Sequence, residues 1–99
     1  MIRHVVLWKL KNRADAPALA ARLEALNGRI PGLIRLTAGA DVLGEAQSAD
    51  LALVADLESL DALVAYQAHP AHQEVVPLMR EAATSRLAAD FELDPSAAD

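Results

Sequence analysis

Cysteine is absent from this chain of 99 residues, and aromatic side chains occur at only three positions, Trp8, Tyr66 and Phe91. The lack of cysteine excludes disulfide bonds and thiolate chemistry, and it fits a reducing compartment. No apolar run approaches the roughly 20 residues that a transmembrane helix needs. The apolar start of the chain is interrupted by His4 and by two lysines, unlike an export signal. We therefore expect a soluble cytoplasmic protein with no membrane segment.

Basic residues are few and scattered: the chain has 9 lysines and arginines against 14 aspartates and glutamates, for a net charge of −5. A nucleic-acid-binding surface requires clustered basic residues, so no nucleic-acid partner is expected. The four glycines are spread along the chain and form no phosphate-binding loop. No serine has the setting of a nucleophile. We expect no cofactor, and histidine and tyrosine remain as the side chains able to carry chemistry.

The pattern of apolar residues predicts four strands and two helical regions in the order β-α-β-β-α-β. Strands with alternating or continuous apolar residues are expected over 2–11, 33–42, 51–57 and 85–93, with a polar loop over 44–50. This order is typical of the ferredoxin-like fold of the α+β class, which has a four-stranded antiparallel sheet. We expect one domain over residues 1–94, followed by a frayed tail over 95–99.

Capping residues and prolines set the expected ends of the helices. The first helix is predicted to begin at Asp15 and to continue to Ile30, because leucines recur at helical spacing up to that point and Pro31-Gly32 follows. Ser59 is placed to cap the second helical region. Pro77 is expected to bend or restart that region.

The first and third predicted strands are apolar on both sides. Val5 and Leu7 alternate with the series that runs from Ile2 to Leu10, and Ala52 and Val54 alternate with three leucines. Two helices can cover only one face of the sheet, and a domain of this size buries only about 60–65% of its unfolded surface. An exposed apolar face usually marks an interface. We therefore expect a homodimer that forms through the sheet face.

The string Tyr66-Gln67-Ala68-His69-Pro70-Ala71-His72 holds the only tyrosine and two of the three histidines. Each polar residue in it has a structural interpretation. His69 precedes a proline, so it can mark the start of a new helical segment. Tyr66 lies close to an apolar stripe and can be a core residue, and His72 can be a surface residue. His4 falls on the buried side of the first strand, where its ring needs a polar partner.

Metal binding is a third interpretation of the histidines. His69 and His72 are three residues apart and could share an ion, with His4 or Glu74 as a further ligand. The signal is weak, because the proline between the two histidines already explains the shape of the string. We therefore predict no metal site.

Three segments, HVVLWKLK (4–11), DLALVADLESLDALVAYQAHPAH (50–72) and SRLAADFEL (85–93), resemble the stress-responsive A/B barrel family (Dabb, dimeric α+β barrel). The resemblance implies that two four-stranded sheets pack into one barrel across a dimer interface. The family includes the plant olivetolic acid cyclase, a polyketide cyclase that works without a cofactor. Its active-site residues correspond to His4, Tyr66 and His72, and a further histidine of the cyclase is replaced by Leu51. The resemblance implies that His72 takes a proton next to a carbonyl and that Tyr66 holds the oxyanion.

Two kinds of function follow from the sequence. One is a cofactor-independent enzyme that transfers a proton on a small apolar carbonyl compound, as an aldol-type cyclase or isomerase, with His4, Tyr66 and His72 at the site. The other is a dimer that binds a hydrophobic ligand or protects against stress without turnover. Because one fold hosts many reactions, a cofactor-free monooxygenase-like activity also stays open. Convergence of the three side chains on one cavity would favour the enzyme.

Overall fold

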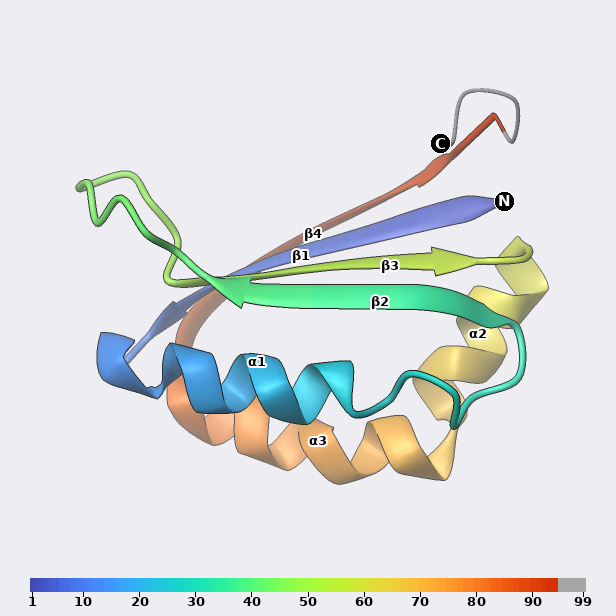
Figure 1. Ribbon diagram of the computed structural model, residues 1–99, viewed down its shortest axis with the longest axis horizontal. Helices are drawn as coiled ribbons and strands as arrows, with labels where there is room; N and C mark the ends of the chain where they lie inside the picture. Colours follow the sequence, from blue (N-terminus) through green and yellow to red (C-terminus); the bar gives the residue numbers. More distant parts are fainter. Residues whose placement is uncertain (95–99) are drawn as a thin grey trace.

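The computed structural model describes residues 1–94, so the expected tail over 95–99 lies outside the described residues. Four strands and three helices form two layers (Figure 1). The strands are β1 (Ile2–Leu10), β2 (Leu33–Ala40), β3 (Leu51–Leu57) and β4 (Ala83–Glu92); the helices are α1 (Ala16–Glu24), α2 (Leu60–Ala68) and α3 (Pro70–Ala82). All four expected strands are present, and their ends lie within two residues of the predicted ones.

The sheet is antiparallel throughout, with the strand order β2-β3-β1-β4. The strand order and the alternation of strands with helices confirm the ferredoxin-like α+β fold. The first and last strands of the chain are neighbours, and their register places His4 opposite Asp90 and Trp8 opposite Arg86. All three helices lie on the same side of the sheet (Figure 1).

The core lies between the helices and the inner side of the sheet. Alternate residues of β1 and β3 point into it, and apolar residues of α1 and α3 meet them. The buried side chains include Val6, Trp8, Leu23, Leu51, Leu53, Ala55, Leu57, Tyr66, Val75 and Met79. Because only the inner side of each central strand is covered, the alternation in the sequence decides which strand residues enter the core.

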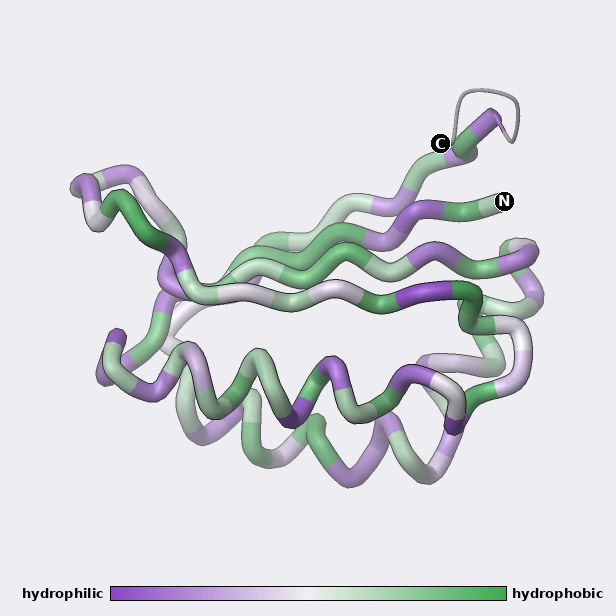
Figure 2. Tube along the Cα trace, in the orientation of Figure 1, coloured by the Kyte–Doolittle hydropathy of each residue, from purple (hydrophilic) through white to green (hydrophobic). Residues whose placement is uncertain are grey.

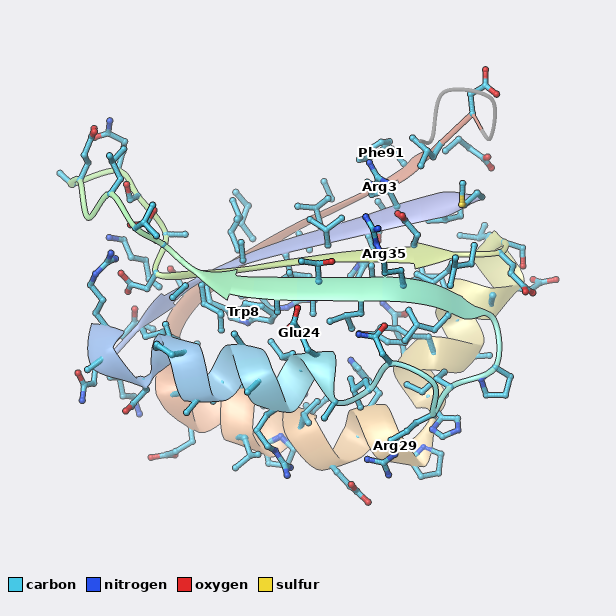
Figure 3. The ribbon with its side chains drawn as sticks, in the orientation of Figure 1. Arg3, Trp8, Glu24, Arg29, Arg35 and Phe91 are labelled. Atoms are coloured by element: carbon cyan, nitrogen blue, oxygen red, sulfur yellow. The ribbon has the colours of Figure 1, made fainter. Side chains whose placement is uncertain are left out.

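The outer side of the sheet is apolar and uncovered by the helices. Leu7, Leu87 and Phe91 are 38%, 71% and 47% exposed on this side, and Leu7 pairs with Leu87 across the sheet. Figure 2 shows the central strands as largely hydrophobic along much of their length. One end of the face is polar, since Arg3 and Arg35 extend away from the helices there (Figure 3). The expectation that the strands are apolar on both sides is confirmed.

The first helix ends earlier than the leucine spacing predicted. The helix α1 stops at Glu24, and a turn follows, although Leu26 and Ile30 are still buried. The side chain of Asn27 donates hydrogen bonds to the carbonyls of Glu24 and Leu36, at 3.0 and 2.8 Å, and accepts one from the Leu36 amide at 2.8 Å. These bonds tie the turn to β2, and Gly28 then takes a φ of +79°. Buried apolar residues therefore keep a helix-like spacing in the sequence beyond the end of the helix itself.

The first helix begins where predicted, with Asp15 at its N-cap position, but Asp15 does not form the expected capping bond. Asn12, and not Asp15, provides the side-chain cap: its amide oxygen accepts from the Ala14 backbone N–H at 3.1 Å and opens a 3₁₀ turn over Arg13–Asp15. Asp15 makes no side-chain capping bond to a described residue. The short 3₁₀ turn places the cap three residues earlier in the chain than a single α-helix would require.

The second helical region is divided where the His-Pro pair predicted. Ser59 caps α2 by accepting from the Ala62 amide at 3.1 Å, which confirms that prediction. His69 is extended, with φ −66° and ψ 138°, and α3 begins at Pro70. Pro77, however, lies inside α3 and does not divide it. It occupies the exposed side of the helix, as does Gln73, so the carbonyl that loses its partner can bond to water.

The loop between β2 and β3 projects beyond the sheet (Figure 1) and is held at its base by ion pairs. The Arg13 guanidinium bonds to the carboxylates of Asp41 and Asp50, at 3.0 Å each. The Asp50 carboxylate also accepts from the Leu10 amide at 2.8 Å, and that bond is the main cause of its lowered pKa. None of the helices within residues 1–94 has the length and apolar character to cross a membrane.

Replacing Asn27 by alanine should destabilise the fold. The variant loses the bonds that satisfy both backbone groups of Leu36, at an expected cost of about 1–3 kcal/mol in the free energy of unfolding. Urea denaturation followed by circular dichroism measures the change. Gln47→Ala, in the projecting loop, is the control and should be neutral. An unchanged unfolding midpoint in Asn27→Ala would show that the turn does not depend on these bonds.

Candidate functional site

A cavity of about 500 Å³ lies between the inner side of the sheet and the helices α2 and α3. Its walls are mostly apolar and come from β1, β3, α1 and α3, with Val6, Trp8, Leu23, Leu53, Val75, Val76 and Met79 among them. The polar groups on its surface include His4, Tyr66 and His72. All three residues expected at the site therefore line one cavity. Its volume falls in the range of small-molecule sites.

Tyr66 lies between the two histidines. Its ring centroid is 4.7 Å from that of His72 and 6.1 Å from that of His4, with the His4 ring in an edge-on arrangement. Burial raises the pKa of its hydroxyl to about 12. Within residues 1–94, every fully buried side-chain oxygen or nitrogen has a hydrogen-bond partner. No described residue hydrogen-bonds to the Tyr66 hydroxyl, so this hydroxyl is not fully buried. The hydroxyl must therefore reach the cavity.

His4 has a partner that the sequence did not indicate. Its ring is buried, and its Nδ1–H donates to the carboxylate of Asp90. The carboxylate can only accept when ionised, so this bond places a proton on Nδ1. No described residue bonds to Nε2, and by the same reasoning that atom faces the cavity. The polar partner that the buried ring requires is therefore Asp90, and the Tyr66 ring lies close to the His4 ring without a hydrogen bond between the two side chains.

His72 is oriented by the end of the preceding helix. Its Nδ1–H donates to the carbonyl of Gln67 at 3.0 Å, which leaves Nε2 as the unprotonated nitrogen of the neutral ring. The ring is half-buried, and burial is the main reason that its pKa is lowered; the charges of His4 and Arg86 act in the same direction, while the bond to Gln67 opposes them. At neutral pH this ring is therefore a free base.

His69 has a structural role. Its Nδ1 accepts a hydrogen bond from the Ala71 amide at 3.0 Å, so the side chain caps α3. It does not line the cavity. Within the part of the chain that the structure describes, no group of three or more His, Asp or Glu side chains could hold a metal ion. The interpretation of His69 as the start of a helical segment is confirmed.

Three further residues of the site were missed by the sequence analysis. Asp90 could have been found by extending the alternation of β4, because it lies opposite His4 on the inner side. Arg80 and Arg86 also line the cavity, from α3 and β4. Leu51 is fully buried but does not line the cavity, and the residue of β3 that does is Leu53. No local signal marked the two arginines.

The fold and the cavity together define the class of this protein: it is a ferredoxin-like α+β domain with a mostly apolar cavity under its sheet. The chain belongs to the stress responsive A/B barrel domain family, whose model matches residues 2–93. An uncharacterised protein of Streptomyces coelicolor is 38% identical over 97 residues, which cover 93% of this chain and 99% of that protein. The family resemblance seen in the sequence is therefore confirmed.

Solved structures share the fold over nearly the whole chain. A dimeric ferredoxin-like protein of unknown function from Thermobifida fusca has a TM-score of 0.81 at 31% identity, with 93% of this chain and 90% of that chain covered. A cofactor-independent oxygenase from Streptomyces nogalater has a TM-score of 0.75 at 17% identity, with 99% and 97% covered. The second likeness shows the fold alone.

The pKa of His72 should lie below its ordinary value of 6.5, which NMR titration of the histidine ring protons can measure, with His72→Gln to assign the signal. Because the folded-state pKa is lowered, the unfolded chain binds more protons below pH 6.5. The contribution of neutral His72 to stability is therefore complete above pH 6.5 and is lost as the pH falls through the folded-state pKa. Urea unfolding should show wild type losing stability relative to His72→Gln over that range. A His72 pKa above 6.5 would contradict this.

Proposed function

We propose that this protein is a cofactor-independent enzyme that transfers a proton on a small carbonyl compound bound in the cavity under the sheet. The expected reaction class is an aldol-type cyclisation or an isomerisation. The observation that carries the proposal is the convergence of Tyr66, His72 and His4 on one mostly apolar cavity, with the Tyr66 ring 4.7 and 6.1 Å from the two imidazole rings.

His72 is the proposed base. Its hydrogen bond to Gln67 leaves Nε2 unprotonated, and its lowered pKa keeps the ring neutral near pH 7. In the proposed step, Nε2 takes a proton from the carbon next to the carbonyl, and the electron pair of the broken C–H bond moves to form an enolate. A positioned base typically contributes about 10²–10⁴ in rate.

Tyr66 is the proposed donor to the enolate oxygen. Since the pKa of its hydroxyl is about 12, the group stays protonated at neutral pH and can donate a hydrogen bond as negative charge develops. Tyr66 is buried beside the apolar part of the cavity wall, and such surroundings strengthen a charge-assisted hydrogen bond relative to water. The same burial that raises the pKa therefore supports the role.

His4 is the proposed second proton carrier. The carboxylate of Asp90 accepts from its Nδ1–H and would stabilise the imidazolium that forms when Nε2 binds a proton. This arrangement places a carboxylate-supported imidazole on one side of Tyr66 and a neutral imidazole on the other. Proton removal and proton return can then occur at different groups.

We also infer that the protein forms a homodimer through the outer side of the sheet. Leu7, Leu87 and Phe91 are partly or largely exposed there, and an apolar face of this kind usually marks an interface. Similar structures are described as dimeric, including the one from Thermobifida fusca. Two sheets packed face to face would form the α+β barrel that the family name describes.

A non-catalytic ligand-binding role is the second candidate. The apolar walls of the cavity favour it, because Val6, Leu53, Val75 and Met79 would hold a hydrophobic ligand whether or not a reaction followed. Binding without turnover requires no particular protonation state of His72. The two candidates therefore differ in whether the removal of a single proton-carrying group abolishes a reaction or only changes affinity.

The test of the enzyme is hydrogen–deuterium exchange next to the carbonyl of small ketones, followed by proton NMR in D₂O. Wild-type protein should accelerate the exchange. His72→Gln should lower the rate by about 10²-fold or more because the base is lost, and Tyr66→Phe by about tenfold or more because a donor is lost.

His69→Gln is the control for the His72 variant, since His69 lies in the same string but outside the cavity. It should keep the wild-type exchange rate. Circular dichroism must show that every variant is folded. Equal exchange rates in wild type, His72→Gln and Tyr66→Phe would exclude proton transfer at this site and leave the binding role.

Leu87→Glu should convert the proposed dimer into a monomer. The side chain is 71% exposed in one chain, so the substitution leaves the core intact, while a two-fold interface would contain it twice. Sedimentation velocity at micromolar concentration measures the mass. Leu60→Glu, at a 61% exposed site on α2, is the control and should remain dimeric. A wild-type protein that sediments as a monomer would disprove the interface.

A further inference from the structure

We propose that the cavity selects a ligand with a carboxylate on an apolar body, and that Arg86 and Arg80 bind this carboxylate at the mouth of the cavity. The inference rests on the proposed function, because it names the substrate class of the same site. It draws on residues that the proton-transfer chemistry does not use.

The charge of the cavity is opposite to that of the chain. The chain has a net charge of −5, yet neither aspartate nor glutamate is among the described residues that line the cavity. Arg80 and Arg86 are the permanently charged side chains there. The carboxylate of Asp90, on the same strand as Arg86, is engaged by His4. A bound anion would therefore meet positive charge without a competing acidic side chain on the cavity wall.

The two arginines are available for a ligand. The side chains of Arg3 and Arg13 form ion pairs with aspartates, whereas the side chains of Arg80 and Arg86 form no ion pair or hydrogen bond with any other described residue. Their side chains are exposed, as expected at the mouth of a cavity. A guanidinium group presents paired N–H donors that match the two oxygens of a carboxylate.

Arg86 lies close to the reacting groups as well as to the mouth. It occupies the inner side of β4, opposite Trp8 of β1. Its charge acts on both Tyr66 and His72: it opposes the rise in the Tyr66 pKa that burial causes, and it adds to the fall in the His72 pKa that burial causes. A carboxylate held by Arg86 would thus be near the tyrosine and the histidine, with the carbonyl of the same molecule free to reach them.

The remaining surface of the cavity defines the rest of the ligand. The deeper walls are formed by Val6, Trp8, Leu53 and Met79, which are buried and apolar. Thr84 and Ser85 line the cavity next to Arg86, at its charged side. The cavity therefore has a charged side and an apolar side, and an oxo acid with an alkyl or ring body fits both.

The test compares 4-oxooctanoate with its neutral amide, which has the same carbon chain and ketone. Isothermal titration calorimetry should show that the wild-type protein binds the acid about tenfold more tightly than the amide. Arg86→Gln should lower the affinity for the acid to nearly the affinity for the amide, and it should leave the affinity for the amide unchanged. Arg80→Gln should have a smaller effect in the same direction. Arg29→Gln, an exposed arginine outside the cavity, is the control and should change neither.

Equal affinity for the two compounds, tighter binding of the amide, or no binding of the acid at millimolar concentration would overturn the inference. An unchanged affinity of Arg86→Gln for the acid would also overturn it. Exchange of the protons next to the ketone, measured on the same two compounds, separates the two proposals. Equal exchange of acid and amide would keep the proton transfer and reject the charge selection. Tighter binding of the acid with no exchange would keep the charge selection and reject the proton transfer.

Discussion

The break between His69 and Pro70 is the constraint on which the site depends. In one unbroken helix, Tyr66 and His72 would be about 120° apart around the axis and about 9 Å apart along it. A residue before proline avoids helical geometry, and His69 is extended. The chain therefore turns between α2 and α3, and the ring centroids of Tyr66 and His72 come within 4.7 Å. The structural and the chemical interpretations of the string are thus two aspects of one feature.

The broken helix also orients the proposed base. A helix end leaves carbonyl groups without partners, and the Gln67 carbonyl at the end of α2 accepts from the His72 ring at 3.0 Å and from the Gln73 side-chain amide at 2.6 Å. The bond to His72 satisfies the helix end and at the same time determines which ring nitrogen carries the proton. The cap of α3 is supplied separately by His69. Each of the two histidines of the string thus has its own backbone partner.

The features predicted from sequence depend on near neighbours in the chain. Strand alternation, the Ser59 cap and the His69–Pro70 break are local patterns, and the structure has all three. The features that were missed depend on distant parts of the chain. The bond between His4 and Asp90 joins residues 86 positions apart, and it exists only because β1 and β4 pair in one register. The end of α1 was likewise decided by bonds from Asn27 to β2, which leucine spacing does not report.

The strand β1 connects the proposed interface with the cavity. Its inner side carries His4, Val6 and Trp8 to the cavity, and its outer side carries Leu7 to the exposed apolar face. Its neighbour β4 is exposed along most of its length, so the strand that supplies Asp90 and Arg86 has little cover within one chain. A second sheet packed against the outer side would cover Leu87 and Phe91 and restrict the motion of β4. Since Asp90 can hold His4 only while β1 and β4 keep their register, dimerisation would stabilise the site from the opposite side of the sheet.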